Sequence, residues 1–376
     1  MPFSPETLHS DEEYDKTSEL TALKVSPEVQ EYIKALWQEI KTLRQDLDTV
    51  RTQPQTNKTI EEQTRIIKRL TILIQLMEES QKNNKIVEEE KKEKDIDRES
   101  ILEQINNAKE ILGKENVFDH EAIKVAFGAE NIQINLEQIP NVPFSEEELE
   151  RAKELGQFLI LRVDKTADGQ SLTMERMNKL LADEFKETGK GKILFKTDDS
   201  GNIEANAWYK NEDFFLEEIP KLSWALVTKE VIPNSLNKNY LGQTTEIIKY
   251  LQNEVFKGQE IPKEYEQAII EFEKAKNEIA ELITKDNWQE AAKTLEGLAI
   301  TKLTRQSPVE ALYDILVYFQ NTEDRLLEKT HTWTGRCYLH GQLVDIGLAD
   351  VDGADVVVYR PAYRNDALGV SLSRSR

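Results

Sequence analysis

The sequence predicts an α+β protein in which a helical N-terminal stalk precedes a mixed domain of helices and short strands. Two series of apolar residues with heptad spacing occupy residues 29–77. Amphipathic stretches alternate with short apolar runs from 145 to 330, and residues 331–376 (hereafter the tail) alternate in character as strands do. The expected organisation is disorder over 1–16, a coiled-coil stalk over 17–115, a linker over 116–144, and a folded domain over 145–376.

The predicted stalk contains two heptad seams separated by a proline. The first places mostly isoleucine at a positions and leucine at d positions, which favours two parallel strands. Pro54 then interrupts the helix, and Gln63 forms one polar layer in the second seam. The seam residues are Val29, Ile33, Leu36, Ile40, Leu43, Leu47 and Val50, followed by Ile60, Gln63, Ile67, Leu70, Ile74 and Met77.

Two arrangements satisfy these seams. In the one we favour, residues 29–77 pair with further copies of the chain and produce a homo-oligomer. In the other, the two seams pack on each other as an antiparallel hairpin within one chain. Either arrangement uses the apolar stripe for burial and leaves no chemistry to the stalk.

Composition excludes several classes of function. Asp and Glu number 70 against 49 Lys and Arg, and the resulting charge of -21 repels nucleic acids and anionic membrane surfaces. No signal peptide and no membrane-spanning stretch is apparent, so we expect a cytoplasmic location, with a virion or cell surface reached only through a partner. Cys337 is the only cysteine, which excludes an internal disulfide and a CxxC zinc site. We expect no cofactor.

Local signals between 145 and 330 predict an α+β domain. Ser145 and Glu148 have the spacing of a capping box for a helix ending near Leu155. The run 158–163 predicts a strand. Further predictions are a helix over 171–185, a hairpin pairing 193–196 with 203–209, and helices near 242–256, 263–283, 287–300 and 308–328.

The tail differs in composition from everything before it. Lys and Glu make up about a quarter of the preceding 330 residues, yet the tail contains neither, and no Met. An all-β subdomain explains part of this, because strands favour Val and Tyr. It does not explain why Arg, Asp, His and Tyr are retained while Lys, Glu and Met are absent.

The genetic code offers a second explanation for the tail. Randomising the adenines of an AAC or AAT codon produces Asn, Asp, His, Tyr, Ser, Thr, Gly, Arg and several apolar residues. It never produces Lys, Glu, Gln, Met or Trp. The tail fits this set apart from Trp333 and Gln342, which would be positions without such codons.

The tail resembles the variable region of target proteins of diversity-generating retroelements. The resemblance rests on Thr332-Trp333-Thr334, then Arg336, and the ending from Arg360-Pro361 through Gly369-Val370-Ser371-Leu372 to Arg374. Those proteins have a C-type-lectin fold of the formylglycine-generating-enzyme type, so the resemblance implies a C-type-lectin-like domain with helical additions over 145–376. It covers the final 45 or so residues well, 145–330 only in the order of strands and helices, and the stalk not at all.

This resemblance implies a ligand surface of scattered side chains on a rigid framework. Trp333, Gly369 and Leu372 would belong to the framework. Tyr and Arg provide large contact areas, and Asp and Asn provide adaptable polar contacts. The candidates for exposed, variable, ligand-binding positions are Cys337, Tyr338, His340, Asp345, Asp350, Asp355, Arg360, Tyr363, Arg364, Asn365 and Asp366.

Two acidic clusters allow an alternative interpretation as calcium sites. Asp164, Asp168, Gly169 and Glu175 match part of a calcium-loop pattern, but a strand precedes them, and Ser171 or Thr173 capping a helix explains them better. The second cluster comprises Asp350, Asp352 and Asp355, where diversification explains the acids equally well. We therefore expect no metal, and His331 and His340 are too isolated for a zinc site.

An enzymatic role is not expected. Formylglycine generation requires a pair of active-site cysteines, and this chain has only Cys337. No P-loop, GxGxxG motif or catalytic triad stands in a suitable context.

The leading hypothesis is a display protein whose tail recognises an unknown ligand, expected to be a protein. The alternative is a structural or adhesin component of a phage or cell-surface assembly with a fixed C-terminal β module.

Overall fold

The computed structural model describes two compact parts of the chain, residues 1–97 and 98–376. Within them it describes residues 27–52, 56, 59–61, 63–69, 71, 98–198, 200–338 and 340–375. The disorder expected over 1–16 lies outside these residues.

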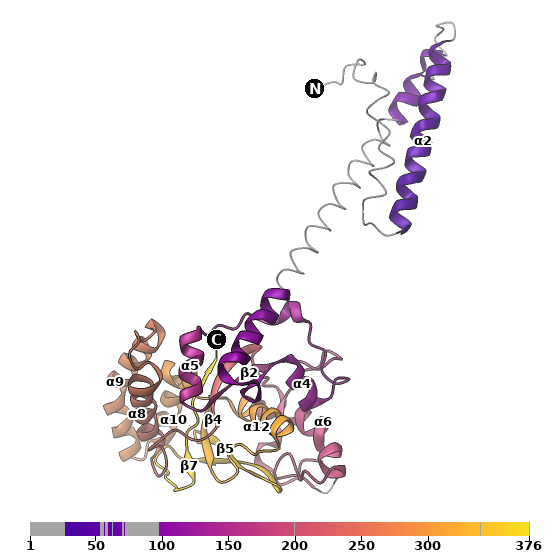
Figure 1. Cartoon of the computed structure of the whole chain (residues 1–376). Coiled ribbons are helices and arrows are strands. Elements are labelled where there is room, and N and C mark those ends of the chain that lie inside the picture. Colours follow the sequence, from indigo (N-terminus) through magenta and orange to yellow (C-terminus); the bar gives the residue numbers. More distant parts are fainter. Residues whose placement is uncertain are drawn as a thin grey trace. The chain divides into compact units, whose positions relative to one another are not determined.

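In the first part, two helices of the same chain lie side by side (Figure 1). Helix α2 spans Pro27–Arg51, and its heptad residues Ile40, Leu43, Leu47 and Val50 are buried. The described residues between 59 and 71 are helical, and the Gln63 side chain donates to the Val50 carbonyl at 3.4 Å. Arg69 forms an ion pair with Glu39. Together with the contact between Gln63 and Val50, this pair shows that the two helices run antiparallel. The hairpin alternative is therefore present within the chain.

The second part contains mixed helices and strands, which confirms the α+β class. Its first helical residues are 98–112. The later helices are α4 His120–Phe127, α5 Glu146–Glu154, α6 Met174–Glu187, α7 Asp213–Leu216, α8 Tyr240–Tyr250, α9 Lys263–Thr284, α10 Trp288–Gly297, α11 Ala299–Thr304 and α12 Pro308–Thr322. The strands are β1 Val117–Phe118, β2 Gln157–Arg162, β3 Ser223–Thr228, β4 His331–Cys337, β5 Leu343–Asp350, β6 Gly353–Tyr359, β7 Leu368–Gly369 and β8 Ser373–Ser375.

These strands form two four-stranded sheets. The first has the order β1-β2-β3-β8, and the second has the order β6-β5-β4-β7. In the first sheet only β1 and β2 run parallel, and β8 returns from the tail to pair with β3 through Leu226 and Arg374. The tail thus supplies the whole second sheet and one edge of the first.

Helix α12 is the centre of the larger hydrophobic core. Ser307 caps its N-terminus in a capping box with Glu310, and nearly every residue from Pro308 to Phe319 is buried. Its apolar side chains pack with both sheets in one cluster, which also includes Phe158 of β2 and Ile346 of β5. A second cluster joins helices α8–α11 to the opposite face of the second sheet.

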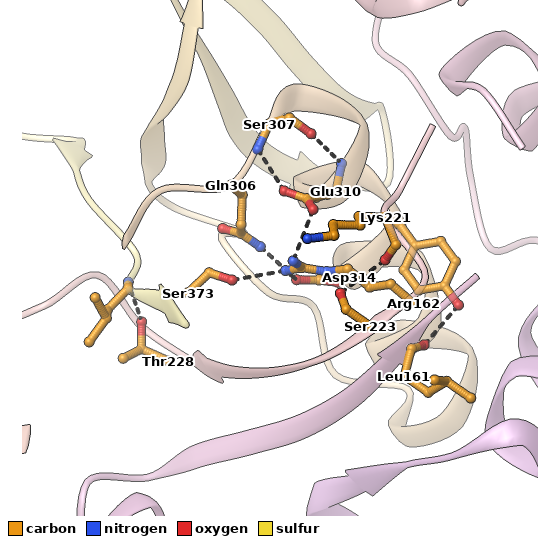
Figure 2. A network of polar contacts seen from close by, with 12 residues as sticks. Leu161, Arg162, Lys221, Ser223, Thr228, Gln306, Ser307, Glu310, Asp314 and Ser373 are labelled. Atoms are coloured by element: carbon orange, nitrogen blue, oxygen red, sulfur yellow. Dashed lines mark hydrogen bonds and ion pairs between the residues drawn. The ribbon is translucent and has the colours of Figure 1, made fainter. Parts of the chain in front are cut away.

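A buried polar network fixes α12 to the first sheet (Figure 2). The fully buried Arg162 of β2 donates to both carboxylate oxygens of Asp314 at 3.0 and 2.6 Å and to the Ser373 hydroxyl of β8 at 3.0 Å. Glu310 lies 3.3 Å from the same guanidinium, and Gln306 donates to Asp314 at 2.6 Å. These five residues, the Arg162 network, join β2, α12 and β8.

Several local predictions are confirmed. The Ser145 and Glu148 capping box begins α5, and the expected strand is β2. Thr173 caps α6. The helices expected near 242–256 and 263–283 are α8, which continues as a π-helix over Leu251–Val255, and α9.

Other predictions need correction. The expected hairpin around 198–202 has only a single bridge between Thr197 and Ile203, and Trp208–Asn211 is a 3-10 helix. The helix expected over 287–300 is divided into α10 and α11, because Leu298 adopts an extended conformation. The helix expected to reach 328 ends at Thr322, because Glu323 adopts a left-handed conformation with φ 65°.

The expected linker over 116–144 was wrong. Val117, Phe118, Ile123 and Phe127 are buried in the same core as α12. The helical residues 98–112, which we assigned to the stalk, also belong to this part, and Ile105 and Leu112 are almost completely buried. Short apolar elements alternate here with polar turns, so the composition of the segment resembles that of a linker.

The Arg162 network predicts that removing a buried charged partner destabilises the fold much more than removing an exposed ion pair. Asp314→Ala leaves a guanidinium buried without its main partner, so we expect a loss of about 3–5 kcal/mol in the free energy of unfolding. Urea denaturation followed by circular dichroism measures it. Glu281→Ala, which removes an exposed ion pair with Lys285, is the matched control and should leave the midpoint nearly unchanged. Equal stability of the two variants would contradict a structural role for the network.

Candidate functional site

The second sheet has an inner face on α12 and an outer face with a different composition. Strand residues alternate between faces, and the valines of β6 illustrate this. Val356 is buried in the core around α12, whereas Val357 is only partly buried. The outer face carries Trp333, Asp345 and Tyr359, because Trp333 pairs with Asp345, and Asp345 in turn pairs with Val357 across β5 and β6.

Residues 360–367, the crossing segment, pass over this outer face. They connect β6 to β7, which lie at opposite edges of the sheet, so the chain must cross β5 and β4. The Tyr363 ring stacks on the ring of Tyr359 with centroids 3.8 Å apart, which places the crossing on the outer face. The segment is anchored by three backbone hydrogen bonds, in which its carbonyls accept from Tyr240, Asn237 and His331.

The crossing segment presents five of the predicted ligand-binding residues. Arg360, Arg364, Asn365 and Asp366 are exposed, as expected, and Tyr363 is partly buried by its stacking. The guanidinium of Arg360 lies over the Trp288 ring at 4.7 Å.

Cys337, Tyr338 and His340 lie at the turn between β4 and β5. His340 is exposed, and the Tyr338 ring packs against His340 at 5.0 Å and against Trp208 at 5.1 Å. Partial burial and nearby Glu296 raise the pKa of the Cys337 thiol to about 11, so this thiol is poorly reactive at neutral pH.

Asp350 and Asp355 occupy separate places. Asp350 ends β5, where its carboxylate accepts from the Asp352 amide at 2.8 Å and its backbone carbonyl accepts from Arg325. Asp355 is partly buried and lies on the outer face, two residues before Val357. The structure therefore distributes the predicted residues over the outer face with its crossing segment, the β4–β5 turn, and the β5–β6 turn.

The predicted exposure of Asp345 was wrong. Its side chain is completely buried on the central strand β5, and its Oδ1 lies 2.9 Å from His331 Nδ1. Burial raises the pKa of its carboxyl to about 6, while His331 acts in the opposite direction. Composition alone could not separate this aspartate from the exposed ones.

Two residues of the outer face were missed as site residues. Tyr359 lies diagonally across from Asp345 on the neighbouring strand, and its ring contacts Trp333 at 6.4 Å. His331 was considered only as a zinc ligand. The period-two alternation of β6, which puts Asp355 and Tyr359 on one face, was the signal that could have identified Tyr359.

The three framework predictions agree with the structure. Trp333 and Leu372 have 1% and 0% of their surface exposed. A side chain at Gly369 would meet Val231 at 2.7 Å, so only glycine fits there. Randomised adenine codons do not produce Trp, so position 333 is not expected to vary. Trp333 is the buried framework residue of the outer face.

In the first calcium candidate, the carboxylates of Asp168 and Glu175 contact other side chains of the same chain. Asp168 accepts hydrogen bonds from the Thr166 hydroxyl and from Arg176, and Glu175 pairs with Lys179 at 2.9 Å. Within the described part of the chain, no group of three or more potential metal ligands lies together.

Comparisons of the chain with protein-family models, with curated proteins and with solved structures give no match. Among the residues that the structure describes, no helix combines the length and apolar character needed to cross a membrane.

The raised pKa of Asp345 predicts a specific dependence of stability on pH. Because the folded state holds this proton more tightly, stability from Asp345 is lost as pH rises from about 4 to about 6. We expect Asp345→Asn to match the native chain at pH 4 and to exceed it by on the order of 3 kcal/mol above pH 7.

Urea denaturation of both proteins across this pH range measures the difference. Asp183→Asn changes an exposed aspartate of α6 in the same way, and its stability should parallel the native curve. A variant at position 345 that is less stable than the native chain at pH 7 would contradict this account.

Proposed function

We propose that the protein is a ligand-binding display protein whose tail is diversified by a retroelement, on a C-type-lectin-like scaffold. The ligand is a protein or surface molecule bound over the crossing segment and the neighbouring turns. Under this proposal the Arg162 network and α12 hold the scaffold while the exposed tail residues change.

One observation carries the proposal: the crossing segment exposes residues that randomised adenines can produce, although the same set also includes the buried Asp345. Arg360, Arg364, Asn365 and Asp366 are exposed and belong to the set that randomised adenines can produce. Trp333, which that set excludes, is buried. A surface rich in Arg, Tyr, Asn and Asp on a rigid sheet suits adaptable recognition of protein ligands.

The genomic locus tests this proposal. We expect a reverse transcriptase gene nearby and a near-copy of the 3′ end of this gene that differs only at adenines. The differences should fall in codons of the crossing segment and the β4–β5 turn, and should spare Trp333, Gly369 and Leu372. A locus without such a repeat, together with an identical tail in close relatives, would favour a fixed β module of an adhesin or structural assembly.

We also propose that the stalk assembles a homo-oligomer through residues 29–77, which would increase the avidity of a modest site. The intrachain hairpin does not use its whole apolar surface. Ile60 and Ile67, one heptad apart, have 49% and 43% of their surface exposed. This stripe supports pairing between hairpins of separate chains.

Light scattering after size exclusion tests the assembly. We expect the full chain to have the mass of a dimer or larger oligomer, and the double variant Ile60→Gln, Ile67→Gln to be a monomer with unchanged helicity. Val125→Gln, which alters an exposed apolar residue of α4, is the control and should not change the mass. A monomeric native chain would refute this part of the proposal.

A further inference from the structure

We propose that Trp288 is a constant contact residue of the recognition surface, which comprises the crossing segment and the neighbouring turns, and that side chains of a protein ligand pack on its ring. This inference rests on the proposed function of the tail, and it extends the surface to helix α10, which lies outside the tail. Three features carry it: an indole ring outside both apolar clusters, its contact with Arg360, and its position between two segments of the tail.

Trp288 differs from the other tryptophans in the second part of the chain. Trp224 and Trp333 are almost completely buried. Trp208 is partly buried, packs against the core around α12, and donates its indole N–H to the Val356 carbonyl at 2.9 Å. Trp288 is also partly buried, but among the described residues it belongs to neither apolar cluster. A structural role in the core therefore does not account for its large ring.

The Trp288 ring contacts the tail. The Arg360 guanidinium lies over the ring at 4.7 Å and 3.4 Å from the carboxylate of Asp286. Arg360 is itself exposed and is one of the candidate variable positions. Most residues that randomised adenine codons produce are shorter than arginine, so at position 360 they would leave one face of the ring uncovered. The ring would remain in every variant, because position 288 precedes the tail.

The beginning of α10 lies between two segments of the tail. Helix α10 packs beside β4 (Figure 1). On one side of its first turn, Trp288 contacts Arg360 of the crossing segment. On the other side, the β4–β5 turn approaches so closely that a Cβ added at Gly341 would lie 2.7 Å from the Cα of Gln289. A ligand that covers both segments of the tail would therefore also cover the beginning of α10.

A tryptophan on a rigid helix suits the role of a constant contact residue. Tryptophan is enriched among the residues that dominate the binding energy of protein interfaces, because its large ring loses little conformational freedom on binding. Ala291, Ala292 and Leu295 of α10 are buried in the second apolar cluster, so the helix is held in place. The charge of -21 disfavours polyanions as ligands. These properties favour a protein ligand.

Selection from a displayed library tests this role. In the full chain, the five exposed candidate positions receive AAC codons with randomised adenines, and binders are selected against maltose-binding protein as the probe. These positions are His340, Arg360, Arg364, Asn365 and Asp366. Trp288→Ala is then introduced into each binder, and biolayer interferometry gives the affinities. We expect most binders to lose at least about tenfold in affinity, and to lose less with Trp288→Phe, which keeps an aromatic ring.

Ile270→Ala is the matched control. Ile270 is an exposed apolar residue of α9 outside the tail. Its neighbour Glu271 accepts a hydrogen bond from the Ala299 amide, which lies beyond the opposite end of α10. This variant should bind as its parent does. Urea denaturation supplies a second readout, in which Trp288→Ala should leave the midpoint nearly unchanged, because the ring belongs to neither apolar cluster.

The outcomes separate this inference from the proposed function. Binders whose affinity does not depend on Trp288 would overturn the inference and leave the proposed function standing. A loss of affinity together with a large decrease in the unfolding midpoint would also overturn it, because the ring would then be structural. A library that yields no binder would remove the proposed recognition surface, and this inference with it.

Discussion

The bidentate contact between Arg162 and Asp314 is the constraint on which the rest of the domain depends. Arg162 belongs to a strand whose residues are all buried, so its charge cannot reach water. Asp314 lies on α12, the helix around which both sheets pack, and Ser373 belongs to the returning strand β8. The contact therefore fixes strand, helix and tail in one arrangement.

This constraint distinguishes the scaffold, whose residues pack in the core, from the surface whose residues we propose to be variable. On the inner face of the second sheet, Val344, Ile346 and Val356 pack into the core around α12, and substitutions there would create cavities or clashes. Most side chains of the crossing segment are exposed, so most substitutions there would not create cavities or clashes. Substitution of Arg364 or Asp366 removes no core contact.

Local chemistry made part of the fold predictable. The capping box at Ser145, the apolar run of β2 and the long amphipathic pattern of α9 are properties of neighbouring residues, and all three are present. The elements between 116 and 144 were missed because their stability comes from distant partners. Phe118, for example, packs its ring against Tyr318 of α12 at 5.4 Å.

The sequence predicted which residue types form the candidate site, but it did not predict how deeply each side chain is buried. The strand character of the tail followed from residue types, and the exposure of Arg360 and Asn365 was expected from the resemblance of the tail to a variable region. The burial of Asp345 did not follow, since it depends on the position of β5 between β6 and β4 and on the helices α8–α11 that pack on that face. Contacts between elements so far apart in the chain leave no periodic trace in the sequence.

The return of β8 to the first sheet also bears on how the chain folds during synthesis. Arg162 and Ser373 are separated by 211 residues. Until the ribosome has released the last strand, the edge of β3 stays open and Arg162 lacks one of its acceptors. Contacts between such distant residues form slowly. A nascent chain would thus expose an unpaired strand edge from the synthesis of β3 until that of β8, and chaperones that shield such edges could bind there during this interval.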